Sequence, residues 1–526
     1  MSVKHAGVNL PLFSARSTHG WGIGELRDLV PLARWLSAAG FDRVMLLPLG
    51  TMEDGQSSPY SATSTLAIDP LFISLEDVPD FAAAGGEARL SPLARESLEL
   101  ARSAGTVRYD LVRRAKADAL ARAFDAFLTA EWEQLTPRAA ALAAYIARER
   151  WWLEDYALFQ AVAATMPSVP WRVWPAPLRD REPAALDDAR RQLARDVLRQ
   201  QYWQWIAETE WQEARTAARA LGVGVFGDLP FVANAHSPEV WARASEFRLD
   251  VSVGVPPDAF SAVGQDWGLP AYNWDAIAGT DYAWLRQRAR RMAALYDGIR
   301  VDHVIGLFRT YCRPAHGDPF FSPADEPDQR AQGLRVLTLL GESGAAIIAE
   351  DLGLVPDFLR ESLTALSVPG CKVLRWERQW REPGAPFIDP RGYPADSAAM
   401  TGTHDTETLA IWWDDLSRED RHALLALAAS AGATDARLRV DWSPAVRDAL
   451  LGLMYRAASR ELFLPIQDLF GWPDRINVPG TVSEANWSWA LPWPVDALAA
   501  QPEAIARQTT LAALARESGR GLDGLD

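Results

Sequence analysis

Cysteine is scarce in this sequence, because 526 residues contain only Cys312 and Cys371. Two thiols cannot form a disulfide framework or a zinc site of the usual four-ligand kind, and they suit a reducing compartment. The sequence also lacks any run of the roughly 20 apolar residues that cross a bilayer, and residues 1–12 lack the apolar core of a signal peptide. We therefore expect a soluble, cytoplasmic protein with no membrane partner.

Positive charge is also in deficit: 53 Lys and Arg stand against 69 Asp and Glu, which leaves a formal net charge of −16. This balance disfavours nucleic acid as a partner, but it is compatible with a neutral ligand such as a sugar. Tryptophan, by contrast, is abundant, with 23 residues. Indole faces can stack on sugar rings, although most indoles serve packing.

Several motifs for cofactors and nucleophiles are missing. The glycine-rich segment at residues 20–24 lacks the spacing of a dinucleotide-binding fingerprint, and no phosphate-binding lysine follows it. The sequence has no Gly-x-Ser-x-Gly elbow. His303 and His404 lie far apart in the chain and have no cysteine partner. We therefore expect neither a cofactor nor a metal ion.

Short apolar runs recur along the chain, and most of them precede a stretch with helical periodicity. Residues 24–40 are the clearest such stretch, with an apolar stripe and Gly40 at the expected C-terminal cap. Eight parallel strands with helices between them predict a (β/α)8 TIM barrel, and a doubly wound open sheet is the alternative. The eight strand candidates are residues 6–13, 44–49, 222–229, 298–302, 346–350, 370–374, 399–402 and 461–465.

The stretch from residue 81 to 219 has a different composition, rich in Ala, Arg, Glu and Leu, and shows no clear strand. We interpret it as a mostly helical subdomain inserted after the second strand and broken by a proline-rich segment at residues 167–177. The predicted organisation is a first part of the barrel at residues 1–80, the insertion at 81–219, and the rest of the barrel, with the catalytic strand ends, at 220–526.

Three acidic residues lie where predicted barrel strands end, which is where barrel enzymes carry their chemistry. Asp302 and Glu350 close two of the strands, and Asp405 follows a third within Thr401-Gly-Thr-His-Asp405. The two-residue period of a strand puts Arg300 on the same face as Asp302, so Arg300 is expected to reach that carboxylate and keep it ionised. A single acid at a strand end usually makes a salt bridge or a helix cap, but three together favour a catalytic site.

Carboxylates at such a site suit the cleavage of a glycosidic bond. One carboxylate attacks the anomeric carbon and forms a covalent glycosyl–enzyme, while a second carboxyl group protonates the leaving oxygen and later deprotonates the incoming one. The proton donor needs a raised pKa, which a neighbouring carboxylate can provide by repulsion. A third carboxylate can bind sugar hydroxyls and help to distort the ring.

Segments along nearly the whole chain resemble the amylomaltase (4-α-glucanotransferase) family, glycoside hydrolase family 77 of the α-amylase clan. Arg300-Val-Asp-His303, Ala349-Glu-Asp-Leu-Gly353 and Gly402-Thr-His-Asp405 are similar to its catalytic motifs. The other matching segments are residues 7–16, 19–24, 58–64, 227–230, 255–260, 264–270 and 475–480.

The resemblance implies a role for each matching residue. Asp302 would be the nucleophile, Glu350 the acid/base and Asp405 the transition-state stabiliser. Tyr60 would stack on the donor sugar, Arg300 would orient the nucleophile, and Gln265 and Trp267 would lie over the acceptor side. The residues implied in substrate binding are Tyr60, Asp228, Gln265, Trp267, Arg300, His303, His404 and Asn477.

Two departures from the family pattern bear on fine specificity. The chain has Thr406-Glu407-Thr408 where many relatives have Asn-Asp-Thr, and Asn486-Trp-Ser-Trp489 lacks the arginines that often follow this tryptophan. For transfer, a sugar hydroxyl must react in preference to water, which requires a surface for the acceptor and exclusion of solvent. We expect residues 254–270 to form a loop that closes over the site, with Gly264, Gly268 and Pro270 at fixed bends.

These observations predict a 4-α-glucanotransferase that moves segments between donor and acceptor α-1,4-glucans by a retaining double displacement, without a cofactor. An α-glucan hydrolase of the same clan and a glucan-binding protein without catalysis are the two alternatives. The sequence indicates no protein partner.

Overall fold

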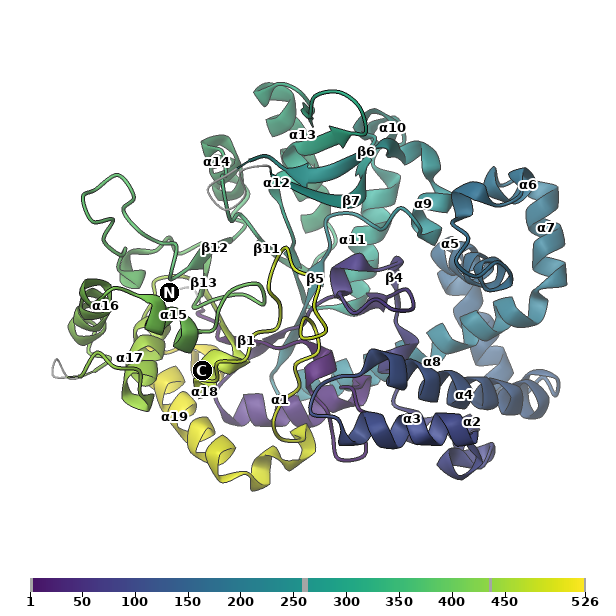
Figure 1. Ribbon diagram of the computed structural model, residues 1–526, viewed down its shortest axis with the longest axis horizontal. Coiled ribbons are helices and arrows are strands. Elements are labelled where there is room, and N and C mark those ends of the chain that lie inside the picture. The colour runs from purple at the N-terminus through teal and green to yellow at the C-terminus, as the bar shows by residue number, and fades with distance from the viewer. Residues whose placement is uncertain (1–2, 258–263, 435–437, 525–526) are drawn as a thin grey trace.

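Eight parallel strands form a closed barrel in the order β1-β14-β13-β12-β11-β8-β5-β2 (Figure 1). The structure is a computed structural model and describes residues 3–257, 264–434 and 438–524. The barrel strands are β1 (Gly7–Asn9), β2 (Arg43–Met45), β5 (Gly224–Leu229), β8 (Gly298–Val301), β11 (Ala346–Ala349), β12 (Gly370–Val373), β13 (Ser397–Met400) and β14 (Glu461–Pro465). Each of them lies within or overlaps one predicted strand, so the (β/α)8 fold is confirmed and the open sheet is wrong.

The barrel interior is a packed core, because large side chains from several strands meet on its axis. Phe226 and Phe463 pack together at 5.5 Å between ring centroids, beside Met45 and Met400. Gly298 makes room for this cluster, since a Cβ at its position would come within 2.1 Å of the Phe226 ring. Such a solid interior leaves only the rim of the barrel for a binding site.

Helices surround the barrel and also extend to one side of it (Figure 1). The helices that alternate with the barrel strands or follow them are α1 (Leu29–Ala38), α9 (Pro238–Ala242), α10 (Trp274–Gly279), α11 (Ala283–Leu295), α12 (Ile305–Phe308), α13 (Glu326–Gly341), α14 (Asp357–Ala365), α15 (Leu409–Asp415), α16 (Arg418–Ser430), α17 (Pro444–Tyr455), α18 (Ile466–Phe470) and α19 (Pro502–Ser518). No α-helix follows β12, because residues 374–396, all of them described, contain only a short 3-10 turn at Pro390–Gly392.

The stretch before β5 is helical, as its composition predicts. It contains α2 (Pro79–Ala83), α3 (Pro92–Ser103), α4 (Tyr109–Phe127), α5 (Pro137–Thr165), α6 (Ala176–Arg179), α7 (Pro183–Gln192) and α8 (Ala194–Ala220). The two long helices α5 and α8 pack together, and α8 also contacts α1 before the chain enters β5. None of the helices in the described part of the chain is long and apolar enough to cross a bilayer.

Two small sheets lie outside the barrel and were not predicted. One joins β3 (Gly50–Thr51) to β4 (Ser64–Ile68), and the other has the order β10-β9-β6-β7. Its strands are β6 (Phe247–Val255), β7 (Gln265–Tyr272), β9 (Thr310–Pro314) and β10 (Phe320–Ser322).

The expectation of a loop over residues 254–270 is therefore wrong at its two flanks. Gly254 pairs with Asp266 and Val255 pairs with Gln265 in an antiparallel hairpin of β6 and β7. Backbone hydrogen bonds to a neighbouring strand hold these residues extended, and glycine and proline alone did not reveal that pairing. Residues 256, 257 and 264 lie outside the strands, and residues 258–263 of the expected loop lie outside the described residues.

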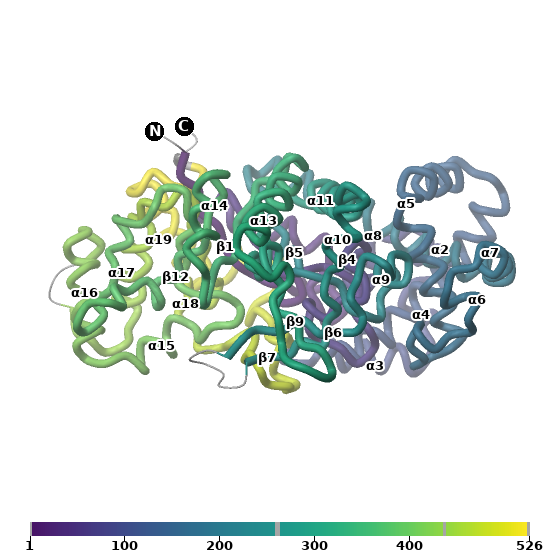
Figure 2. The backbone as a smooth tube through the Cα atoms, turned by 90° about the horizontal axis from the view of Figure 1, so that it is seen from above, coloured from purple at the N-terminus to yellow at the C-terminus, as the bar shows by residue number. Residues whose placement is uncertain are grey.

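Both chain termini lie on one face of the barrel, and the β6–β7 hairpin lies on the opposite face (Figure 2). On the terminal face, the fully buried guanidinium of Arg520 links segments that are distant in sequence. It donates to five carbonyl oxygens, those of His5, Tyr455, Ala457, Ser459 and Arg460, at 2.5–3.4 Å. Arg520 therefore fastens β1 and the segment before β14 together.

We expect Arg520→Met to lower the free energy of unfolding by about 3 kcal/mol or more, because buried carbonyls lose their donor and each unpaired group costs about 1–3 kcal/mol. The denaturant midpoint followed by circular dichroism measures the change. Arg516→Met is the matched control, since Arg516 is exposed on the preceding helix. Equal midpoints for the two variants would contradict the role of Arg520.

Candidate active site

The predicted carboxylates of positions 302 and 350 lie at the ends of neighbouring strands. In the register of β8 and β11, Val301 pairs with Ala349, and the next residue of each strand is the acid. The Glu350 N–H donates to the Val301 carbonyl at 3.0 Å, and the Asp302 N–H donates to the Leu229 carbonyl at 3.1 Å. The two acids are therefore held side by side at the carboxyl-terminal rim, as the strand pattern predicts.

Arg300 links two of the predicted site residues from within the barrel wall. Its Nη1 donates to Asp228 Oδ2 at 2.6 Å and to Asp302 Oδ1 at 2.9 Å. The predicted contact between Arg300 and Asp302 is thus confirmed. Tyr60 joins the cluster because its hydroxyl donates to Asp228 Oδ2 at 2.7 Å. A buried guanidinium shared by two carboxylates fixes the position of the partly exposed Asp302.

Glu350 has the opposite environment. Burial and the negative charge of Asp302 raise the pKa of Glu350 to about 8, against the opposing effects of Arg300 and two backbone N–H groups. Those N–H groups belong to His303, which donates to Oε2 at 2.7 Å, and Leu352, which donates to Oε1 at 3.1 Å. The left-handed backbone of His303, with φ 46°, is a conformation that residues other than glycine rarely adopt. Because its pKa is raised to about 8, Glu350 is mainly protonated at pH 7.

Asp405 is fixed by two other predicted residues. Asn477 Nδ2 donates to Asp405 Oδ1 at 2.6 Å, and His404 Nε2 lies 3.3 Å from Asp405 Oδ2. Burial raises the pKa of Asp405, but the charge and hydrogen bond of His404 and the hydrogen bond of Asn477 outweigh it and hold the pKa below its usual range. The side chain is 45% exposed, and solvent favours the same ionised form.

Aromatic rings line one side of the site. The rings of Tyr60 and His404 are stacked at 5.2 Å between centroids, and Trp487 lies 5.7 Å from each of them. Trp487 was not predicted as a site residue, although its segment was singled out for a departure from the family pattern. Its position beside His404 results from tertiary packing, which sequence spacing does not indicate.

The β6–β7 hairpin contributes the remaining two predicted residues on the other side. The Trp267 ring meets the His303 ring edge to face at 4.7 Å, and the Trp267 indole N–H donates to Gln265 Oε1 at 3.1 Å. Burial lowers the pKa of His303 to about 4, so its imidazole is neutral at pH 7. Gln265 is exposed and joins the cluster through its hydrogen bond with Trp267.

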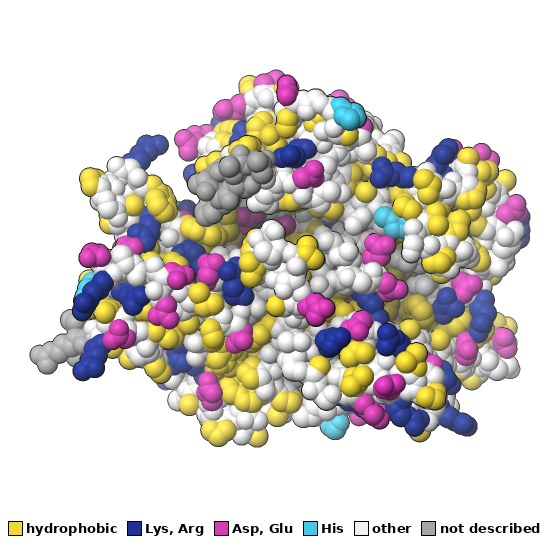
Figure 3. Space-filling view, in the orientation of Figure 1, with side chains coloured by type: hydrophobic (Ala, Val, Ile, Leu, Met, Phe, Trp, Pro, Cys, Tyr) yellow, Lys and Arg dark blue, Asp and Glu magenta, His cyan; other side chains and the backbone are white. Residues whose placement is uncertain are grey.

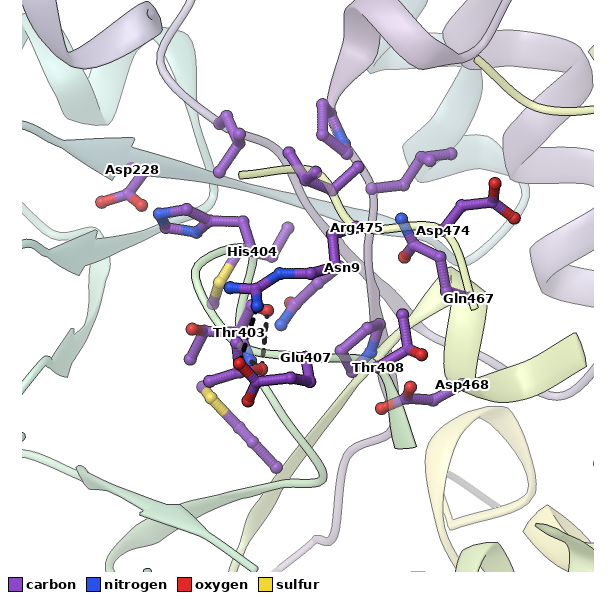
Figure 4. Close-up of a pocket in the computed structure, with 18 of the residues that line it drawn as sticks. Asn9, Asp228, Thr403, His404, Glu407, Thr408, Gln467, Asp468, Asp474 and Arg475 are labelled. Carbon is purple, nitrogen blue, oxygen red and sulfur yellow. Dashed lines mark hydrogen bonds and ion pairs between the residues drawn. The ribbon is translucent and has the colours of Figure 1, made fainter. Parts of the chain in front are cut away.

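A pocket extends from Asp228, Arg300 and His404 into the space beside β1, β13 and β14 (Figure 4). Figure 3, on the same face as Figure 1, shows the surface hollowed near its centre, with acidic side chains gathered in the hollow. Among the residues that the structure describes, no group of three or more His, Cys, Asp and Glu side chains has the geometry to hold a metal ion. Asp302 contacts Arg300 at the edge of this pocket, Glu350 lies at the neighbouring strand end, and the rings of Tyr60 and Trp487 contact His404.

Comparisons with known proteins give a consistent result. A family model described as 4-alpha-glucanotransferase, glycoside hydrolase family 77, matches residues 10–496. The 4-alpha-glucanotransferase of Chlamydia pneumoniae is 32% identical over 501 residues, which cover 93% of this chain and 91% of that protein. The one from Thermus thermophilus is 32% identical over 495 residues, which cover 90% and 92%. The amylomaltase from Streptococcus agalactiae, solved in complex with acarbose, has a TM-score of 0.82 at 26% identity and covers 98% of this chain and 100% of its own.

We expect the protonated carboxyl band of Glu350 in an infrared titration to persist through pH 7 and to disappear near pH 8, because its raised pKa favours the protonated form up to that point. Subtracting the spectrum of Glu350→Gln removes the bands of the other buried carboxyl groups. Asp302→Asn deletes a negative neighbour and should shift the titration to lower pH. A titration midpoint between pH 4 and 5, the range of an ordinary glutamate, would contradict this assignment.

Proposed function

Because the chain belongs to the 4-α-glucanotransferase family, glycoside hydrolase family 77, we propose that its two strand-end carboxyl groups perform a retaining double displacement on α-1,4-glucans. The chain is an enzyme, and its activity is that of a 4-α-glucanotransferase rather than of a hydrolase. The observation that carries the mechanism is the pair Asp302 and Glu350: neighbouring strand ends hold them side by side, Arg300 binds Asp302, and the pKa of Glu350 is raised to about 8.

In the first step Asp302 attacks the anomeric carbon of the donor, and Glu350 gives its proton to the leaving glycosidic oxygen. The bond between the sugars breaks, a glycosyl ester forms on Asp302, and the shortened glucan departs. In the second step the Glu350 carboxylate takes the proton from an acceptor hydroxyl, whose oxygen attacks the same carbon and releases Asp302. Arg300 supports this cycle by orienting the nucleophile through its hydrogen bond to Asp302 Oδ1.

The residues around Asp405 are proposed to bind the donor sugar at the reacting position. The ionised Asp405 can accept hydrogen bonds from sugar hydroxyls and stabilise positive charge on the ring. His404, Asn477 and Asp228 offer further polar contacts, and the Tyr60 ring offers a stacking surface. The relative from Streptococcus agalactiae binds acarbose, which supports donor and acceptor glucans as the partners of this site.

We propose that Gln265 and Trp267 cover the acceptor side. The contact of Trp267 with His303 places the hairpin beside the backbone N–H that binds Glu350. An indole there can stack on the acceptor and exclude water from the glycosyl–enzyme. Residues 81–219 are proposed to be an inserted helical subdomain between barrel parts at 1–80 and 220–526. The free thiols of Cys312 and Cys371 support a cytoplasmic location.

With maltotriose as the only substrate, we expect glucose and a ladder of longer oligomers, as transfer requires, and hydrolysis would give only shorter sugars. Asp302→Asn should lower kcat by at least about a thousandfold, because no glycosyl–enzyme can form. Chromatography of the products measures both effects. The control Asp281→Asn changes a 75% exposed side chain and should keep full activity. An Asp302→Asn enzyme as active as the wild type would disprove the assignment.

Trp267→Ala should lower the ratio of transfer to hydrolysis by about two- to thirteenfold, which corresponds to one lost stacking contact of about 0.5–1.5 kcal/mol. Reducing ends and transfer products from maltotriose, measured together, give the ratio. Phe320→Ala is the matched control, because β10 lies at the opposite edge of the same small sheet. An unchanged ratio in Trp267→Ala would exclude Trp267 from acceptor binding and solvent exclusion.

A further inference from the structure

Arg475 uses all three of its guanidinium nitrogens around the pair formed by Asp405 and Asn477. Nε donates to the Asn477 carbonyl at 3.2 Å, and Nη2 donates to the Asp405 carbonyl at 2.9 Å. Nη1 donates to Glu407 Oε1 at 2.6 Å (Figure 4). Arg475 therefore holds the backbone of both residues whose side chains meet in the hydrogen bond from Asn477 to Asp405.

Glu407 is held in turn from a third loop. Arg375 follows β12, its side chain is 4% exposed, and its Nη1 donates to Glu407 Oε2 at 2.9 Å. Arg375 Nη2 also donates to the Glu407 backbone carbonyl at 2.6 Å. Each carboxylate oxygen of Glu407 thus has its own arginine, and both its side chain and its main chain are fixed.

The chain of contacts joins three segments at one rim of the barrel: the loop after β12, the loop after β13 and the segment after β14. No α-helix follows β12 in the described residues 374–396, so the position of Arg375 is set by loop contacts. The planar guanidinium fork can hold several acceptors at once, which a lysine cannot do. Removing the carboxylate would leave the two arginines facing each other without an anion between them.

We propose that Glu407 is a positioning residue for glucan transfer, which sets the orientation of Asp405 and Asn477 through Arg475 and is itself locked by Arg375. The proposal rests on the proposed role of Asp405 at the donor sugar. Glu407 lines the same pocket as Asp228 and His404, but both of its carboxylate oxygens are bound by arginines, so its loss is expected to change where Asp405 lies. A small displacement of such a group weakens the binding of the transition state more than the binding of the substrate.

The test is the steady-state kinetics of maltotriose disproportionation by the full chain. Glu407→Gln should lower kcat by about ten- to hundredfold while KM changes little. The reason is that a misplaced stabilising group stabilises the transition state less, while substrate binding is nearly unchanged. Glu407→Asp keeps a carboxylate and should lose less activity. The matched control is Glu517→Gln, which removes a carboxylate from an ion pair with Arg456 on the outer helices and should leave kcat unchanged.

A double-mutant cycle tests the linear order of the contacts. Arg375→Met and Glu407→Gln interrupt the same chain, so the double variant should be no slower than Glu407→Gln alone. Losses that multiply in the double variant would overturn the proposal. So would wild-type kinetics in Glu407→Gln, or a raised KM at unchanged kcat, which would indicate a direct contact with glucan. If Glu407→Gln does not fold, the comparison of Arg375→Met with Glu407→Asp decides by the same criteria.

Asp405→Asn separates this proposal from the function on which it rests. If Asp405→Asn is nearly inactive and Glu407→Gln is normal, the positioning role is wrong and the proposed function stands. If Asp405→Asn itself is fully active, the role of Asp405 is wrong, and the positioning argument falls with it.

Discussion

The buried guanidinium of Arg300 is the interaction on which the site depends. The register of β5 and β8 places Asp228 directly beside Arg300, and the strand period places Asp302 on the same face two residues later. Three acidic groups would otherwise gather at one rim and raise one another's pKa. A single cation fixed in the barrel wall offsets that repulsion and positions Tyr60 through Asp228.

The environment of each carboxyl group, more than its residue type, decides whether the group holds a proton or stays ionised. Glu350 is enclosed and faces a neighbouring negative charge, so it retains a proton. Asp405 is open to solvent and receives hydrogen bonds from two neighbours, so it stays ionised. Backbone N–H groups would favour an ionised Glu350, but burial outweighs them. The rim of the barrel therefore carries both a proton donor and a fixed negative charge, which a double displacement uses.

Much of the fold could be predicted from the sequence, because parallel barrel strands are buried on both faces and leave continuous apolar runs. The contact between Arg300 and Asp302 followed from strand periodicity alone. The small β10-β9-β6-β7 sheet was missed because its strands are partly exposed and lack such runs. Trp487 and the bridge from Arg375 through Glu407 to Arg475 were missed for another reason. They join loops that are distant in sequence, and no local pattern records which loops meet.

The seam between β1 and β14 has a consequence for how the protein is made. Gly7 pairs with Phe463, and the His5 carbonyl accepts a hydrogen bond from Arg520, so the barrel wall closes only after β14 has been synthesised. Until then β1 and the most recently made strand present unpaired edges, which are prone to aggregation. The long helices α5 and α8 pack on each other through contacts closer in sequence, and such local contacts form early. Synthesis therefore yields an ordered helical part first, attached to a half-built barrel that depends on its final strand.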